Sequence, residues 1–165
     1  MHTSKYLMNI DLDEYIVPHS KQTIPELLGY LESDDKNIAA FNFQNAFFCL
    51  QLPDDTNRKY DLRVLKKTLR TQSYNPPRKR SKYICVTKNI VEVGIHFVWE
   101  SERGVNLNVS PENGTLYHYR HCGTSKEWGG DKHVVDQWIY LIQDELIGRV
   151  KNKWLELSKR NCFLD

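Results

Sequence analysis

Apolar and polar positions along the first part of the chain predict a strand followed by a helix. Residues 5–10 form a short, largely apolar run that predicts a buried strand leading into Asp11. Thr23 opens a Thr-x-x-Glu capping box with a proline in the first turn, and apolar residues follow at i, i+3, i+4 and i+7. This pattern predicts an amphipathic helix that ends near residues 33–35.

The middle of the chain predicts several further strands. They are expected over residues 38–52 with a bend near Asn45, over 81–100 with a turn at Lys88 and Asn89, over 105–109, and over 115–119. Residues 53–80 are polar and basic and contain two adjacent prolines, so we expect a loop there with a short helix around 62–69.

Residues 133–157 predict the longest helix. They carry an apolar stripe made up of Val134, Trp138, Leu141, Ile142, Val150, Trp154 and Leu157. The predicted order is therefore strand, helix, several strands and long helix. That order is typical of an α/β or α+β chain with a mixed sheet.

Composition narrows the classes of protein. The 165 residues are enough for one domain, and 40% hydrophobic with 27% charged residues predicts a folded, soluble chain. A net charge of +2 argues against a nucleic-acid binder, and the Arg-Lys-Arg cluster at 78–80 is too short for a nuclear-localisation signal. No apolar run reaches the roughly 20 residues of a membrane-spanning helix, and residues 1–10 lack a signal peptide's apolar core.

Cysteines and sequons favour a secretory protein whose targeting segment is not in this chain. The four cysteines have no C-x-x-C spacing, and they allow two disulfides in three pairings or four buried thiols. They are Cys49, Cys85, Cys122 and Cys162. Glycosylation sequons begin at Asn108 and Asn113.

The most informative chemistry lies in the Asp-x-Asp at the end of the first predicted strand. Residues i and i+2 of a strand share a face, so we expect Asp11 and Asp13 to project together while Leu12 points into the core. Two adjacent carboxylates repel unless a cation lies between them, and oxygen ligands suit Mg²⁺ or Mn²⁺. The alternative is a solvated acidic turn that closes the strand.

Two chemistries fit such a site. In the first, the aspartates hold Mn²⁺ against the diphosphate of a nucleotide sugar. In the second, Asp11 is a nucleophile that takes a phosphoryl group and Asp13 is the acid/base, an arrangement that resembles the first motif of haloacid-dehalogenase-type aspartyl phosphatases. Asp54 and Asp55 are the candidates for the further acidic pair of such a phosphatase.

Ordered blocks over nearly the whole chain resemble glycosyltransferase family 92. They are residues 10–18 (IDLDEYIVP), 23–28 (TIPELL), 41–43 with 47–48 (FNF and FF), 80–84 (RSKYI), 91–96 (VEVGIH) and 116–120 (LYHYR). The resemblance implies a GT-A-like α/β fold, a mixed sheet flanked by helices. Only ten residues precede Asp11, so residues 1–165 are expected to be a single partial domain, the acceptor-side half without the nucleotide-binding half.

The resemblance also implies a metal site. Asp11 and Asp13 are then the metal-binding pair, and Mn²⁺ (or Mg²⁺) is the ion. Enzymes of this fold often add a late histidine, for which His118 is the first candidate and His96 the second. An imidazole suits this ion when its other nitrogen is held by a neighbour.

The implied reaction is transfer of a hexose, galactose from UDP-galactose, to a glycan acceptor such as an N-glycan or a polysaccharide. Arg120 and Lys82 are the candidate diphosphate contacts. Glu100 and Glu127 are the candidates for the general base that deprotonates the acceptor hydroxyl.

The resemblance places the full-length enzyme in the Golgi lumen as a type II membrane protein, anchored by a segment missing from this chain. A non-catalytic remnant that binds a glycan or a partner through Trp99 and Trp128 remains the alternative of a different class.

Overall fold

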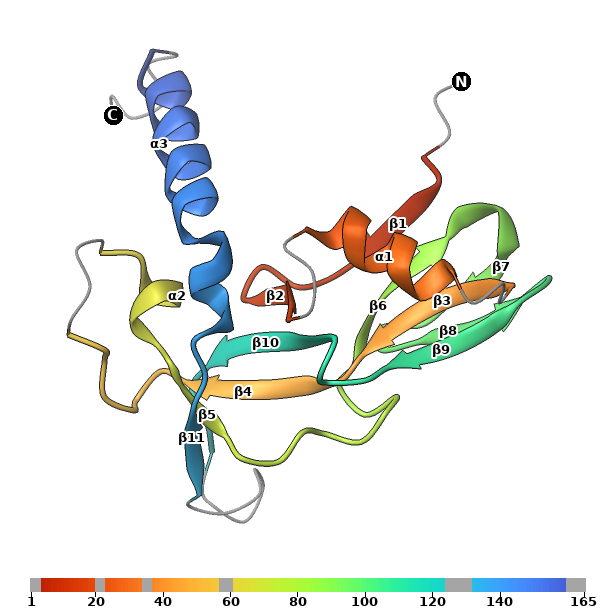
Figure 1. Cartoon of the computed structure of the whole chain (residues 1–165), viewed down its shortest axis with the longest axis horizontal. Coiled ribbons are helices and arrows are strands. Elements are labelled where there is room, and N and C mark those ends of the chain that lie inside the picture. The colour runs from red at the N-terminus through yellow and green to blue at the C-terminus, as the bar shows by residue number, and fades with distance from the viewer. Residues whose placement is uncertain (1–3, 20–22, 34–36, 57–60, 124–131, 160–165) are drawn as a thin grey trace.

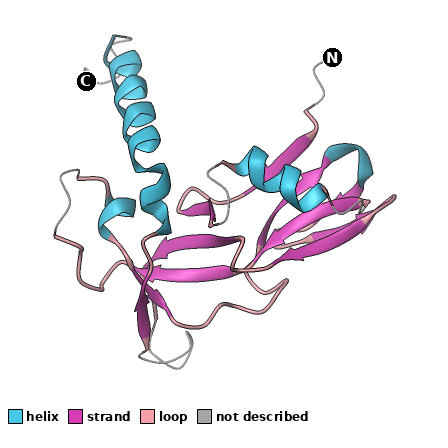
Figure 2. Cartoon of the chain, viewed as in Figure 1, coloured by secondary structure: helices cyan, strands magenta, loops and turns pink. Residues whose placement is uncertain are grey.

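The structure is a computed structural model, and it describes residues 4–19, 23–33, 37–56, 61–123 and 132–159. Figures 1 and 2 show its strands and helices in two colour schemes. The strands are β1 Tyr6–Asn9, β2 Glu14–Pro18, β3 Ile38–Phe43, β4 Asn45–Cys49, β5 Leu69–Thr71, β6 Lys82–Val86, β7 Ile90–Val93, β8 Val98–Ser101, β9 Val105–Val109, β10 Gly114–Arg120 and β11 His133–Val135. The helices are α1 Ile24–Glu32, α2 Arg63–Lys66 and α3 Gln143–Lys159, with 3-10 turns η1 Thr87–Asn89 and η2 Trp138–Ile142.

Two mixed sheets carry the fold. One has the order β1-β6-β3-β9 and the other β11-β5-β4-β10-β2, while β7 and β8 form a separate hairpin. The β3–β4 run and the β9–β10 run lie side by side through both sheets, because β3 pairs with β9 and β4 with β10 in parallel (Figure 1). The remaining pairs are antiparallel, so the predicted α/β class with a mixed sheet is confirmed.

Helix α1 covers one face of the first sheet, as the capping-box pattern predicts. Thr23 accepts a hydrogen bond from the backbone of Glu26, whose carboxylate accepts one from the Thr23 backbone in return. Leu27 and Leu28 are buried against a core shared with aromatic and aliphatic residues of β3, β6, β9 and β10. Ser33 forms the C-cap, which agrees with the expected end of the helix.

A second core lies on one face of the other sheet. Phe48 of β4 packs there with Tyr117 and Tyr119 of β10, at ring-centroid distances of 4.2 and 5.0 Å. Leu65 of α2, Ile139 of η2 and Ile147 of α3 close this core from the helical side. Since odd-numbered positions of β10 point into this core, the even-numbered His118 points to the opposite face.

The predicted long strand over 38–52 is two strands in two sheets. The chain leaves the first sheet at Phe43 and enters the second at Asn45, so the bend expected near Asn45 is a change of sheet. The prediction that the first strand is buried is wrong. Strand β1 lies at the sheet edge, where Leu7 is 51% exposed.

The helix predicted over 133–157 begins only at Gln143. Residues 133–135 pair antiparallel with β5 instead, and Asp136 then receives hydrogen bonds from Arg70, Tyr117 and the Trp138 backbone. These long-range contacts hold the segment extended and override its helical periodicity. Beyond them α3 extends away from the sheets (Figure 1). None of the helices in the described ranges combines the length and the apolar character needed to span a bilayer.

One disulfide resolves part of the open cysteine pairing. Cys49 at the end of β4 is bonded to Cys122 just after β10, while Cys85 is a buried free thiol. Cys162 lies outside the described residues. The bond therefore ties together the ends of two adjacent parallel strands.

We expect the double variant C49S/C122S to be less stable by about 2 to 4 kcal/mol, because the bond closes a loop with a sequence separation of 73. Thermal and urea unfolding with and without reductant measure this. A reductant should lower the Tm of the wild type and leave that of the variant unchanged. Equal stability of the two proteins contradicts the prediction.

His19 is a buried histidine that the fold holds in its neutral form. Its ring stacks on Trp138 at 4.9 Å, and its Nε2 is buried without a hydrogen-bond partner among the described residues. Burial lowers the pKa of His19, and Arg70 adds to this, while Asp136 and a hydrogen bond with the Pro111 backbone oppose it. The unfolded chain therefore binds a proton at this residue at a higher pH than the folded chain does.

Because this folded-state pKa is depressed, the wild type should lose stability as the pH falls below about 6.5. His19→Phe keeps an aromatic ring on Trp138 and removes the titration. Its stability should therefore decline less than that of the wild type in urea unfolding between pH 7.5 and 5.5. Parallel pH profiles of the two proteins disprove this account.

Candidate functional site

A polar pocket of about 390 Å³ lies beside the turn that joins β1 to β2. Its walls are entirely ionisable, with acids from the turn and arginines and histidines from the strand ends and loops. The lining residues are Asp11, Asp13, Glu14, Arg80, His96, His118, Arg120 and His121. The pocket thus brings together groups that a metal or a phosphate could use, from segments more than 100 positions apart in sequence.

The acidic motif lies in this turn and not at the end of an extended strand. The Glu14 backbone N–H donates to the Asp11 carbonyl at 3.2 Å, and the Asp11 N–H donates to Glu14 Oε2 at 2.9 Å. Asp11 and Asp13 both line the pocket, as expected, with side chains 60% and 50% exposed. The expectation that Leu12 points into the core is wrong, because the turn leaves its side chain fully exposed.

Strand register brings His118 to the acidic turn. In the antiparallel pair of β2 and β10, His118 lies directly opposite Glu14. His118 Nε2 is 3.2 Å from Asp13 Oδ2, and its Nδ1 is 3.3 Å from both Glu14 Oε1 and Asn45 Nδ2. Burial lowers the pKa of His118, and Asp13 partly opposes that effect. The neutral imidazole that results is the form in which histidine binds metal ions.

Beneath the turn lies a buried ion pair. Glu14 and Lys82 are both almost fully buried, and Lys82 Nζ is 3.7 Å from Glu14 Oε2 and 3.1 Å from Asp11 Oδ2. Burial raises the pKa of Glu14, while the Asp11 N–H and Lys82 lower it. Lys82, expected as a diphosphate contact, therefore has its ammonium under the acidic turn and does not line the pocket.

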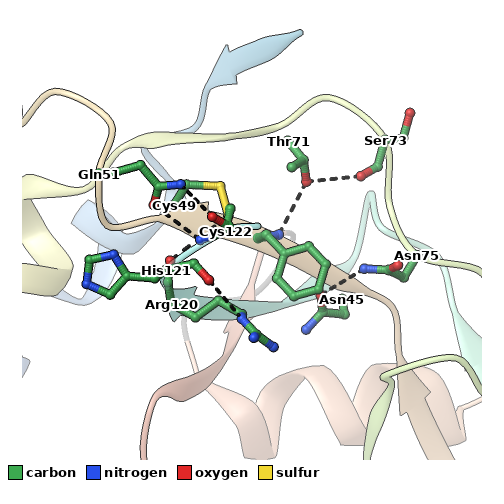
Figure 3. Close-up of a disulfide and its surroundings, with 10 residues drawn as sticks. Asn45, Cys49, Gln51, Thr71, Ser73, Asn75, Arg120, His121 and Cys122 are labelled. Carbon is green, nitrogen blue, oxygen red and sulfur yellow. Dashed lines mark hydrogen bonds between the residues drawn. A yellow bond between two sulfur atoms is a disulfide. The ribbon is translucent and has the colours of Figure 1, made fainter. Parts of the chain in front are cut away.

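The Cys49–Cys122 disulfide lies near Gln51, Arg120 and His121 (Figure 3). Gln51 donates to the Cys122 carbonyl at 2.8 Å and accepts from the Cys122 N–H at 3.2 Å. These contacts keep the end of β10 beside the end of β4, where the Arg120 Nε–H donates to the His121 carbonyl at 3.3 Å. Arg120, expected as a diphosphate contact, does line the pocket.

Arg80 is a site residue that sequence reasoning missed. Its guanidinium lies 6.0 Å from the ring centroid of Phe47, on the same ring that Arg120 approaches at 5.8 Å. Arg80 and Arg78 both have left-handed backbones, with φ of 59° and 68°. The signal in the sequence is an arginine two positions before strand β6, within a basic cluster that sequence analysis assigns to a solvated loop.

The remaining candidates are placed as follows. His96, between β7 and β8, lines the pocket, and its Nδ1 is buried without a hydrogen-bond partner among the described residues. Glu100 lies on β8, is exposed and does not line the pocket. Glu127 and Trp128 lie outside the described residues. Trp99 is 60% exposed, and its indole lies so close to Gly94 that a Cβ there would be 2.1 Å from Nε1.

The acidic pair considered for a phosphatase lies elsewhere. Asp54 forms an ion pair with Lys67, and Asp55 accepts a hydrogen bond from the Tyr140 hydroxyl at 2.9 Å. Neither lines the pocket that contains Asp11 and Asp13.

The pocket residues fit a hard divalent ion in type, since two carboxylates and an imidazole are suitable ligands for Mn²⁺ or Mg²⁺. Within the described ranges, no three His, Cys, Asp or Glu side chains stand close enough together to hold an ion by themselves. Asp13 and His118 form the nearest pair, while Asp11 Oδ2 is directed to Lys82.

Comparison with known families decides between the two chemistries. The sequence model of glycosyltransferase family 92 matches residues 1–160, nearly the whole chain. The chain belongs to glycosyltransferase family 92. A comparison with curated proteins found no match. Family 92 membership makes glycosyl transfer the activity class, with a glycan acceptor, and the aspartyl-phosphatase alternative loses its basis.

The buried pair of this family 92 chain should be sensitive to loss of one charge. Lys82→Met leaves Glu14 buried without its counter-charge, so we expect a loss of about 3 kcal/mol in stability. The double variant E14Q/K82M removes both charges and should recover most of that loss. Urea unfolding of the wild type, the two single variants and the double variant measures the coupling. If Lys82→Met is as stable as the wild type, the predicted dependence of Glu14 on its counter-charge is wrong.

Proposed function

We propose that this chain carries the metal and diphosphate site of a metal-dependent glycosyltransferase that transfers a hexose, galactose from UDP-galactose, to a glycan acceptor. The observation that carries the proposal is the 3.2 Å approach of His118 Nε2 to Asp13 Oδ2 in a pocket whose other wall is cationic. Two ligands of one octahedral ion lie about 3 Å apart, so a single ion can replace this contact.

Asp13 and His118 are the proposed direct ligands of Mn²⁺ or Mg²⁺, with Asp11 as the second carboxylate. Ions of this kind are commonly held by one or two carboxylates together with substrate phosphates. The ion supplies positive charge where the leaving diphosphate develops negative charge.

The cationic wall is the proposed binding site of the diphosphate. Arg120 and Arg80 lie on the same aromatic ring and both line the pocket that the acidic turn also lines. A planar guanidinium suits a phosphate because it can donate two parallel hydrogen bonds. Arg120 and Arg80 would therefore hold the diphosphate of the proposed donor.

The proposed compartment is the Golgi lumen. Support comes from the Cys49–Cys122 disulfide, since such bonds persist in oxidising compartments. The sequon at Asn108 adds to this, since that residue is exposed on β9.

The first test removes the carboxylates. D11N and D13N should each lose Mn²⁺-dependent binding of UDP by at least about 10-fold, because each variant removes a charged oxygen ligand. Isothermal titration with UDP in Mn²⁺ and in EDTA measures this. D61N, at an exposed aspartate paired with Lys66, is the matched control and should bind as the wild type does. Unchanged binding in both variants overturns the metal assignment.

The second test separates the diphosphate from the ion. R120Q should weaken UDP binding by about 10-fold and leave Mn²⁺ binding in the absence of nucleotide unchanged, because a guanidinium binds the phosphate and is no ligand for the ion. Titrations with Mn²⁺ alone and with UDP at saturating Mn²⁺ distinguish the two effects. Loss of Mn²⁺ binding in this variant contradicts the division of roles.

A further inference from the structure

Glu14 is the residue on which both halves of the proposed metal site converge. One carboxylate oxygen, Oε2, accepts the Asp11 N–H at 2.9 Å, and the other, Oε1, lies 3.3 Å from His118 Nδ1. The side chain is 2% exposed, so it is separated from solvent while Asp11 and Asp13 are at least half exposed. A carboxylate in this position contacts both the Asp11 turn and His118, the two groups that the proposal assigns to the ion.

His118 has neighbours that favour two different tautomers. Asn45 Oδ1 accepts a hydrogen bond from Asn75 at 3.0 Å, which turns the Asn45 amide nitrogen toward His118 Nδ1. That donor favours a ring with its proton on Nε2, facing Asp13. An ion at Nε2 needs the lone pair of that nitrogen, so the proton must then lie on Nδ1. The acceptor available for it is Glu14 Oε1.

We propose that Glu14 is a positioning residue that holds His118 in the metal-binding tautomer and fixes the Asp11 turn, with Lys82 as its buried counter-ion. This inference rests on the proposed function, because it assigns a role toward the same ion. A carboxylate that accepts a hydrogen bond from a ligating histidine fixes the ring and makes it a better ligand. Lys82 Nζ lies 3.7 Å from Glu14 Oε2 and supplies the opposite charge beside this buried carboxylate.

Glu14→Gln tests the role with almost no change in shape. If the carbonyl of the introduced amide keeps the Asp11 N–H, its NH₂ group faces His118 Nδ1 and opposes the proton there. If the amide turns over, Asp11 loses its partner instead. Either way one of the two contacts fails, so Mn²⁺ affinity should fall about 10- to 100-fold.

The readouts are Mn²⁺ titration followed by EPR and the ¹⁴N modulation that a directly bound imidazole produces in pulsed EPR. The wild type and the control E112Q, at an exposed turn glutamate, should show tight binding and the ¹⁴N signal. E14Q should show weak binding and a reduced signal. E14Q/K82M, which removes both buried charges, should fold stably and still bind weakly.

The possible outcomes separate the role of Glu14 from the existence of the metal site. E14Q with wild-type affinity and a full ¹⁴N signal overturns the role of Glu14 and leaves the metal site standing. Weak binding in E14Q that E14Q/K82M restores to wild-type strength shows that only the buried charge matters, and it also overturns the role. A wild type without any Mn²⁺ binding overturns the proposed function, and the inference with it.

Discussion

The buried charge of Glu14 is the constraint on which the site depends. Removing a carboxylate from water costs several kcal/mol unless other groups interact with it. Here those groups are the Asp11 N–H, the Lys82 ammonium and the His118 imidazole. They come from the β1–β2 turn, β6 and β10, so these three parts of the chain must meet at one point. This cluster also contacts the two exposed aspartates, since Asp11 interacts with Glu14 and Lys82, and Asp13 with His118.

Strand alternation gives the cluster its geometry. Tyr117 and Tyr119 point into the core against Phe48, and His118 between them therefore points to the other face, opposite Glu14. A slip of one residue between β2 and β10 would turn all of these side chains to the wrong faces. The aromatic core thus fixes the register that builds the site. The Cys49–Cys122 bond holds the far end of the same strand, where Arg120 and His121 line the pocket.

Local signals in the sequence predicted the local structure well. The capping box at Thr23 predicted α1, and alternation predicted β9 at its observed bounds. The acidic pair, His118 and Arg120 were predicted as site residues, and the structure brings all of them to one pocket. Their roles remain proposals. The predictions of α1 and β9 are confirmed because each depends on residues that are neighbours in sequence.

The failures have a common physical origin in long-range contacts. Residues 133–142 have helical periodicity, but pairing with β5 and the hydrogen bonds of Asp136 hold them extended or in a 3-10 turn. Leu12 was predicted to point into the core on the assumption that the strand continues through residues 11–13. The chain turns there instead, because the Asp11 N–H donates to the buried Glu14 carboxylate, and that burial cannot be predicted from the neighbouring residues. Lys82 does not line the pocket, because its ammonium lies beside Asp11 and Glu14 under the turn. Arg80 lies at the pocket on a left-handed backbone that its sequence neighbours do not predict.

The central claim is that Asp13 and His118 bind one ion. Crystals soaked in Mn²⁺ and UDP, with data collected at the manganese absorption edge, test it directly. The account predicts one anomalous peak within about 2.5 Å of both Asp13 Oδ2 and His118 Nε2. An undisturbed Asp13–His118 contact, with no anomalous peak in the pocket at saturating Mn²⁺ and UDP, would contradict it.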